Sequence, residues 1–128
     1  MRTIILSTDW WTDCDDAVAI RLLAAAHHQK KIRLLGVNVN AYHPKSVSSI
    51  LTFMEDCGLS DIPVAIDRDA VDFTGRNTFQ VPVAALSNGK FDGYIAEEPI
   101  SMFRRLLAEA DGPVEIIEIG FPHNLAAL

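Results

Sequence analysis

Short apolar runs alternate with longer helical segments along the chain, and this order limits the possible folds more than any other feature. The apolar runs are residues 3–8, 32–40, 62–66 and 114–119, and the helical segments are residues 15–29, 44–57 and 99–110. Strands and helices that alternate in this way form parallel sheets through right-handed crossovers. We therefore predict an α/β fold: an open, mostly parallel Rossmann-like sheet with helices on both faces.

The expected helices carry further detail. Residues 15–29 contain no glycine or proline, and their apolar positions run nearly all the way round, so this helix should be covered on more than one side. The stretch 67–92 has a mixed composition and is expected to be mostly loop. In the helix 99–110 the expected inner face is Ile100, Phe103, Leu107 and Ala110, with Arg104 and Arg105 facing water.

Length, charge, the start of the chain and the cysteines limit the classes of protein to which this chain can belong. The 128 residues fit one domain, 1–128. A net charge of −6 argues against nucleic acid, which needs a basic surface, and suits a metal cation or a neutral polar substrate. The apolar start is too short for a signal peptide or a membrane span. Cys14 and Cys57 form no metal-binding pair, which favours reduced thiols in a cytoplasmic protein.

Four carboxylates follow the first expected strand within eight positions, at Asp9, Asp13, Asp15 and Asp16. In open α/β sheets, ligands bind at the carboxyl ends of the strands. Carboxylates crowded there must be protonated, hydrogen-bonded or neutralised by a cation. Oxygen ligands without histidine or cysteine indicate calcium or magnesium rather than zinc.

This cluster has other interpretations. Asp13 or Asp15 could simply cap the following helix, with Asp16 in its first turn, although this does not account for Asp9. A calcium EF-hand is excluded because the loop lacks its glycine and runs straight into a helix. An aspartyl-phosphate phosphatase would need a carboxylate where Ser7 or Trp11 stands.

Three motifs in order resemble the inosine–uridine nucleoside hydrolases. Residues 4–9 and 15–20 resemble the DxDxxxDD signature of that family, and residues 58–65 resemble its junction between second helix and third strand. Residues 119–126, Ile-Gly-Phe-Pro-His-Asn-Leu-Ala, resemble its GPLTNLA turn. The resemblance implies hydrolysis of the N-glycosidic bond of ribonucleosides by a water activated by calcium (Ca²⁺).

The resemblance also implies roles for single residues. Asp9 would bind calcium and take the proton from the water, and Asp16 would be a bidentate calcium ligand. His123 stands where a backbone carbonyl ligates calcium. Asp15 would hold the ribose hydroxyls, helped by Asn40 or, with a different register, by Asn38. The aromatic residues Trp10, Trp11 and Phe121 would stack on the base or, as the alternative, serve packing.

Three departures favour a second interpretation. Ser7 replaces the first aspartate of the signature, and five residues separate Asp9 from Asp15 where the family motif has three. Family domains are more than twice this length, so we expect an apparently truncated, N-terminal part of such a domain. The alternative is thus a truncated or degenerate, non-catalytic domain that binds calcium, a ribosyl ligand or a partner chain. An uncovered last strand further predicts a homo-oligomer or other self-association.

Overall fold

Four parallel strands build the sheet, and the first strand of the chain lies inside it. β1 (Arg2–Thr8) pairs with β2 (Ile32–Val39) on one side and with β4 (Val114–Glu118) on the other. β3 (Val64–Ile66) pairs with β2, so the strand order is β3-β2-β1-β4. The predicted α/β class and the parallel, Rossmann-like sheet are confirmed.

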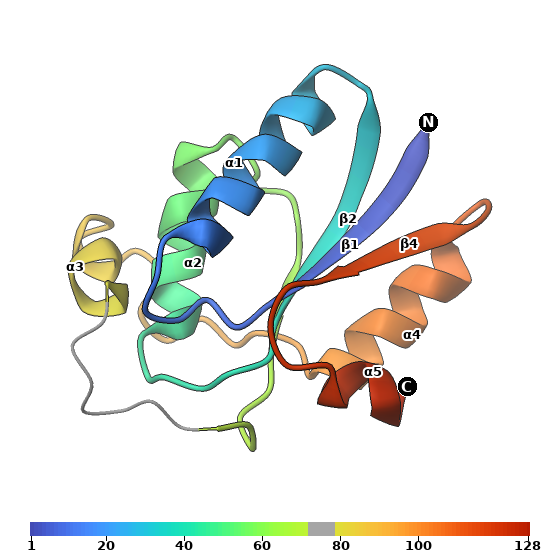
Figure 1. Cartoon of the computed structure of the whole chain (residues 1–128). Coiled ribbons are helices and arrows are strands. Elements are labelled where there is room, and N and C mark those ends of the chain that lie inside the picture. Colours follow the sequence, from blue (N-terminus) through green and yellow to red (C-terminus); the bar gives the residue numbers. More distant parts are fainter. Residues whose placement is uncertain (72–78) are drawn as a thin grey trace.

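Helices cover both faces of this sheet in the computed structural model, which describes residues 1–71 and 79–128 (Figure 1). α1 (Asp15–His28) and α2 (Ser46–Asp56) lie on one face. α4 (Pro99–Glu109) and the short α5 (His123–Ala127) lie on the other. A further short helix, α3 (Gln80–Ala85), contacts α2 at the side of the molecule.

The alternating side chains of β1 divide the core into two parts. Ile4 and Leu6 face α1 and α2, where they join the larger apolar cluster with Ile20 and Ile50. Ile5 faces α4 and belongs to the second cluster. Because β1 is buried on both faces, its sequence is a continuous apolar run rather than an alternating one.

α4 packs through a face that only partly matches the predicted one: Phe103 is buried as expected, but its neighbours on the inner face differ. Its buried side chains include Met102, Phe103 and Leu106, whereas Leu107 is exposed. The reason is Gly36 on β2, where an added Cβ would lie 2.6 Å from a Leu106 methyl carbon and 3.3 Å from the Met102 sulfur. The bare backbone at Gly36 lets α4 settle close to the sheet with these two side chains inward.

Further expectations need correction. Arg104 faces water as expected, but Arg105 is half-buried and paired with Glu97. The predicted loop 67–92 contains α3, and its residues 72–78 lie outside the described part of the chain. α1 is covered on one side only, since Val18 and Leu22 are 53% and 66% exposed. Within the described residues, no helix is long and apolar enough to cross a membrane.

Candidate functional site

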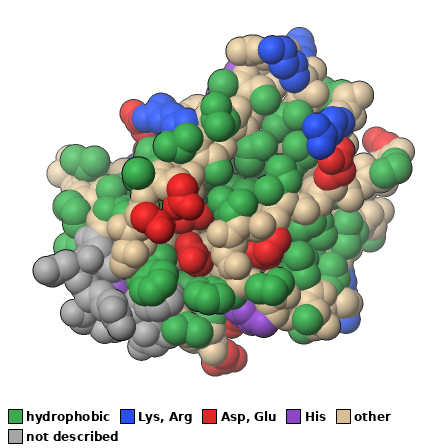
Figure 2. All heavy atoms as spheres, viewed as in Figure 1, with side chains coloured by type: hydrophobic (Ala, Val, Ile, Leu, Met, Phe, Trp, Pro, Cys, Tyr) green, Lys and Arg blue, Asp and Glu red, His purple; other side chains and the backbone are tan. Residues whose placement is uncertain are grey.

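The four aspartates gather where β1 ends and α1 begins. Asp9 directly follows β1, and Asp15 and Asp16 are the first residues of α1. Figure 2 shows acidic side chains grouped over this start of α1. One carboxylate oxygen from each of Asp13, Asp15 and Asp16 lies within 4.8 Å of the others, a spacing that a single metal ion can span. Asp13 and Asp15 are exposed, whereas Asp16 is only 2% exposed.

Hydrogen bonds fix Asp16 in this arrangement. The Thr8 hydroxyl donates to Asp16 Oδ1. The backbone N–H of Asp16 donates to Asp15 Oδ1 at 3.1 Å. The N-cap of α1 is Cys14, and no side chain caps the helix there. Neither Asp13 nor Asp15 is therefore the N-cap residue, although the Asp15 carboxylate accepts one backbone N–H of the first turn.

The electrostatics of the cluster favour neutralisation of the negative charges on its carboxylates. Partial burial, followed by the charge of Asp16, a hydrogen bond with it and the charges of Asp13 and Asp15, raises the pKa of Asp9 to about 7. Burial also raises the pKa of Asp16, and this outweighs its hydrogen bonds from Thr8 and Asp9. No ion pair among residues 1–71 and 79–128 involves these four aspartates. Without a protein cation from these residues, the cluster favours a bound proton and could hold a metal ion.

Trp10 anchors the loop between Asp9 and α1 to the core of the protein. This residue is 1% exposed, and its indole packs against Phe79 and Phe53 with ring centroids 4.9 and 5.4 Å away. Its Nε1 donates to Ser49 Oγ at 2.8 Å. Trp10 has a φ of 46°, a conformation that is rare for a bulky residue and is held by this packing. Packing, not base stacking, is therefore the role of Trp10.

A second anchor comes from α3. The side-chain amide of Gln80 donates to the backbone carbonyl of Trp10, and to that of Trp11 at 3.1 Å. Gln80 is 1% exposed and could not be singled out from the sequence, because a glutamine after a mixed stretch carries no signal of its own. The first part of the longer loop between Asp9 and Asp15 is thus anchored by hydrogen bonds from two other elements.

The two asparagines of β2 and its end lie beside the aspartates, fully buried. Asn38 Nδ2 donates to Ser7 Oγ at 2.9 Å and to Asn124 Oδ1 at 3.0 Å. Asn40 Nδ2 donates to Ser7 Oγ at 3.0 Å and to Glu118 Oε1 at 2.8 Å. Asn40 also has 0% exposure, so in this structure its side chain contacts protein atoms.

His123 lies at the start of α5, outside the acidic group. Its Nε2 is 2.7 Å from Asp67 Oδ2, and Asn124 Nδ2 donates to the same oxygen at 2.7 Å. Partial burial alone would raise the pKa of Asp67, but the hydrogen bonds from Asn124 and His123 lower it. The side chain of His123 is therefore held away from the aspartates, which leaves only its backbone carbonyl for the predicted role.

Sequence reasoning missed three other polar residues at this edge of the sheet. Thr8, Asp67 and Glu118 each follow or end a predicted strand. The rule that ligands bind at the carboxyl ends of parallel strands could have found all three. Four carboxylates close together in the sequence were the stronger signal and drew attention to one strand end alone.

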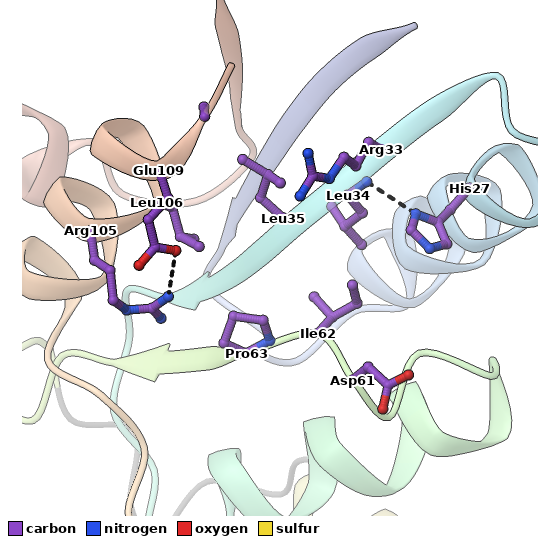
Figure 3. A pocket seen from close by; sticks show the side chains of 11 residues that line it. His27, Arg33, Leu34, Leu35, Asp61, Ile62, Pro63, Arg105, Leu106 and Glu109 are labelled. Atoms are coloured by element: carbon purple, nitrogen blue, oxygen red, sulfur yellow. Dashed lines mark hydrogen bonds and ion pairs between the residues drawn. The ribbon is translucent and has the colours of Figure 1, made fainter. Parts of the chain in front are cut away.

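A first cavity lies away from this edge, and a second adjoins it. One, of about 280 Å³, opens at the opposite end of the sheet between α1, α4 and the start of β2 (Figure 3). There His27 Nδ1 accepts the Leu34 N–H at 3.1 Å and Arg105 pairs with Glu109, so these three side chains serve the fold. The other, of about 490 Å³, adjoins the acidic loop and is lined by Trp10, Thr12, Asp13, Cys14, Ala17, Phe53, Phe79 and Val83.

A parallel sheet with helices on both faces and acidic residues at its carboxyl edge defines a class of α/β protein. Comparison with known structures shows which members of this class the chain resembles. No protein-family model and no curated protein matches the sequence. The solved structure of an inosine–uridine preferring nucleoside hydrolase from Bacillus anthracis matches 99% of this chain with a TM-score of 0.72 and 21% identity. A plant nucleoside hydrolase matches 98% with a TM-score of 0.66 and 20% identity.

These structural neighbours are nucleoside hydrolases, as the sequence motifs indicated, and the chain has their fold. It spans 44% of the length of the first neighbour and 42% of the second. At this level of identity the likeness establishes the fold, and an activity has to be argued from the site itself.

Proposed function

We propose that residues 1–128 form the N-terminal part of a nucleoside hydrolase-like domain that acts on the N-glycosidic bond of ribonucleosides with the help of calcium. The observation that carries this proposal is the group Asp13, Asp15 and Asp16, with ligand atoms within 4.8 Å of one another, at the carboxyl edge of a nucleoside hydrolase fold.

The donor atoms of the site suit calcium. They are all oxygens, and calcium prefers carboxylate and carbonyl oxygens in flexible geometry. Asp16, buried and without a protein cation among the described residues, is the strongest candidate ligand. Asp9 shares a hydrogen bond with Asp16 and would join it, with the backbone carbonyl of His123 as a further ligand. Asp13 is near enough to replace one of these groups.

The chemistry follows from the charges. When bound, calcium would orient a water molecule and make it easier to deprotonate. Asp9, whose pKa is about 7 in the absence of calcium, would take the proton from the water. Asp15 is exposed and accepts hydrogen bonds from the ribose hydroxyls. Asn40, which is buried, would contact the ribose only if its hydrogen bonds to Ser7 or Glu118 opened. Negative charge near the ribose stabilises the oxocarbenium-like transition state.

The second candidate is a non-catalytic domain that binds calcium, a ribosyl ligand or a partner chain. Ser7 favours it, because a hydroxyl replaces a carboxylate in the buried network beside Asn38 and Asn40. One such partner chain is a second copy of this chain. Its contact surface would be the exposed apolar side chains Val18 and Leu22 on α1 and Ile119 just after β4. A concentration-dependent mass in size-exclusion chromatography supports that form of the alternative, and a monomer at all concentrations contradicts it.

Calcium titration by calorimetry tests the proposal, with Asp16→Ala as the control. Binding by the wild-type chain that disappears in the control supports a calcium site at the cluster. Release of base from inosine and uridine then separates the two candidates. Turnover that requires both calcium and Asp9 supports the hydrolase, and calcium binding without turnover supports the non-catalytic domain. No calcium binding by the wild-type chain contradicts both calcium-dependent forms.

A further inference from the structure

Ser7 meets the two buried asparagines through a single atom. Ser7 Oγ accepts hydrogen bonds from Asn38 Nδ2 and Asn40 Nδ2 at 2.9 and 3.0 Å. Ser7 and both asparagines are 0% exposed, so water does not complete this network from outside. A hydroxyl oxygen has two acceptor positions, and these two donors use both of them. Ser7 therefore keeps the hydrogen-bond geometry of an acceptor but brings no negative charge.

The charge at this point comes from the neighbouring strand. Glu118 is the Cα partner of Ser7 in the pairing of β1 with β4. Its Oε1 accepts from Asn40 Nδ2 at 2.8 Å and from the backbone N–H of Gly120 at 2.8 Å. Ser7 and Glu118 thus share the amide group of Asn40 between them. Bonds to an ionised acceptor are roughly twice as strong as neutral ones, so the carboxylate is the stronger of the two holds on Asn40.

This sharing fixes the direction of the Asn40 amide. Both hydrogens of Nδ2 are donated, to Ser7 and Glu118, and Oδ1 accepts the Phe121 N–H at 3.0 Å. A rotated amide would set its oxygen against the Glu118 carboxylate and its NH₂ group against the Phe121 N–H. Only one orientation satisfies all three partners.

The same contacts hold the turn after β4 against the aspartates. A Cβ added at Gly120 would lie 2.5 Å from the backbone nitrogen of Asp9 and 2.5 Å from Asn40 Oδ1. The turn therefore approaches Asp9 closely enough that only glycine fits. Glu118 and Asn40 keep it there through the Gly120 and Phe121 N–H groups, and His123 lies two residues after Phe121.

We propose that Glu118 supplies, from β4, the carboxylate that Ser7 lacks on β1, and so acts as the positioning residue for Asn40 and the turn 120–124. Glu118 acts through these neighbours and is not itself assigned as a ligand of the cation or the ribose. Its value to catalysis or binding rests on the proposed function, whereas its hold on Asn40 and the turn does not.

The buried second oxygen of Glu118 supports a positioning role. Oε2 has no hydrogen-bond partner among the described residues, and neither has Asn38 Oδ1. A buried acceptor without a donor costs stability and calls for an explanation. Placement of its neighbours is such an explanation, because Oε1 alone serves two donors on different segments.

The sharpest test moves the carboxylate from position 118 on β4 to position 7 on β1. We would compare Glu118→Gln, Glu118→Ala and the double variant Ser7→Asp/Glu118→Gln with the wild-type chain. The control is Glu115→Gln, which removes an exposed carboxylate from the same strand, where it pairs with Arg2. The readouts are backbone amide hydrogen exchange at Gly120 and Phe121, the side-chain amide resonances of Asn40, and calcium affinity by calorimetry.

We expect Glu118→Ala to raise the exchange rates of Gly120 and Phe121 by about tenfold or more, and Glu118→Gln by about threefold, since the charged acceptor is the stronger one. Glu115→Gln should leave them unchanged. In the double variant, the carboxylate introduced on β1 would accept from Asn38 and Asn40 in place of the Ser7 hydroxyl. The Asn40 resonances and the protection of Phe121 should therefore return to wild-type values.

Two results would overturn the proposal. One is wild-type exchange at Phe121 in Glu118→Ala and Glu118→Gln. The other is a double variant no better protected than Glu118→Gln alone. If Glu118→Ala does not fold, Glu118→Gln and the double variant still decide the question. Absence of calcium binding in the wild-type chain would contradict the proposed function, while the exchange data would still test Glu118.

Discussion

Two helices of this chain begin with acidic residues, and the two beginnings are built in opposite ways. At α4, the exposed side chain of Glu98 is the N-cap and accepts the N–H groups of Ile100 and Ser101 at 3.1 and 2.9 Å. Although slight burial alone would raise the pKa of Glu98, the hydrogen bonds from these N–H groups lower it. Glu97 beside it pairs with Arg105. Every charge at this end has a partner.

At α1 the aspartates form no ion pair among the described residues, although Asp15 accepts the backbone N–H of Asp16. The helix lacks a side-chain cap, Asp16 is buried, and the pKa values of Asp9 and Asp16 are raised, first of all by burial. The comparison teaches that acidic residues at a helix start are explained by the fold only where caps and ion pairs satisfy them. Where they remain unsatisfied, a ligand is the better explanation.

Asp16→Asn should give the largest difference in calcium affinity between a variant at the start of α1 and a matched variant at the start of α4. The variant keeps an acceptor for the Thr8 hydroxyl but removes the buried charge, so we expect calcium affinity to fall about 100-fold or more, on the order of 3 kcal/mol. Calorimetric titration measures this. Glu98→Gln, the matched change at α4, should leave calcium affinity unaltered. Similar losses in both variants would show that the two ends do not differ in this respect.

The two ends should also respond to pH with opposite signs. A carboxyl with a raised pKa in the folded state stabilises the fold when protonated. The Asp9 contribution is therefore present below the unfolded pKa of about 4 and is lost as pH rises through about 7. We expect a loss of about 1–2 kcal/mol without calcium, after a discount for partial exposure. Glu98 has a lowered pKa, so its contribution is lost as pH falls.

Urea unfolding between pH 5 and 8, with and without calcium, measures this dependence. Calcium should reverse the loss at high pH, because it competes with the proton for the same carboxylates. Asp9→Asn should flatten the curve in the absence of calcium. A wild-type chain that becomes more stable from pH 5 to 8 without calcium would contradict the assignment of Asp9.

Glu98→Ala removes the N-cap side chain of α4 and tests the start of α4 without changing the aspartates at the start of α1. Loss of an N-cap side chain costs about 1 kcal/mol, which corresponds to a fall in Tm of about 3–5 °C for a chain of this size. Thermal unfolding followed by circular dichroism gives this value. An unchanged Tm would mean that the two N–H groups find water instead, and calcium binding should stay as in the wild type in either case.

Arg105→Gln should have the smallest effect. Its ion pairs with Glu97 and Glu109 are about two-fifths to three-fifths exposed, and pairs of this kind contribute at most about 0.5–1 kcal/mol. The shift in the urea midpoint should shrink further in 0.5 M salt because exposed charges are screened. A larger effect than that of Glu98→Ala would show that this pair, and not the cap, secures the start of α4.

Much of the fold was predictable because its signals are local. β1 contains a continuous apolar run and β4 is rich in valine and isoleucine. Pro99 with Glu98 indicates the start of α4 from adjacent positions in the sequence. α3 was missed because it is short and carries Pro82, which usually indicates a loop. The inner face of α4 was misjudged since it depends on Gly36, a glycine in another element of the chain.

The candidate site was predictable only in its acidic half. Asp9, Asp15 and Asp16 stand close together in the sequence, so a motif can find them. Asn40 and Glu118 are 78 residues apart, and their contact depends on the order and register of three strands. The sequence left a ligand role open for Trp10, but the aromatic cluster that buries it includes Phe53 and Phe79 from distant segments.

The pairing of β1 with β4 has a consequence for how the protein acquires its structure. β1 is synthesised well before β4, and Arg2 contacts Glu115 across 113 residues. Closing so long a loop is entropically costly and slow. We predict that the Ile119 N–H, which bonds to the Ser7 carbonyl, becomes protected late in refolding, after the β1–β2 pair. Pulse-labelled hydrogen exchange can time both. The aspartates would then stay open to solvent on a nascent chain until residues 114–118 leave the ribosome.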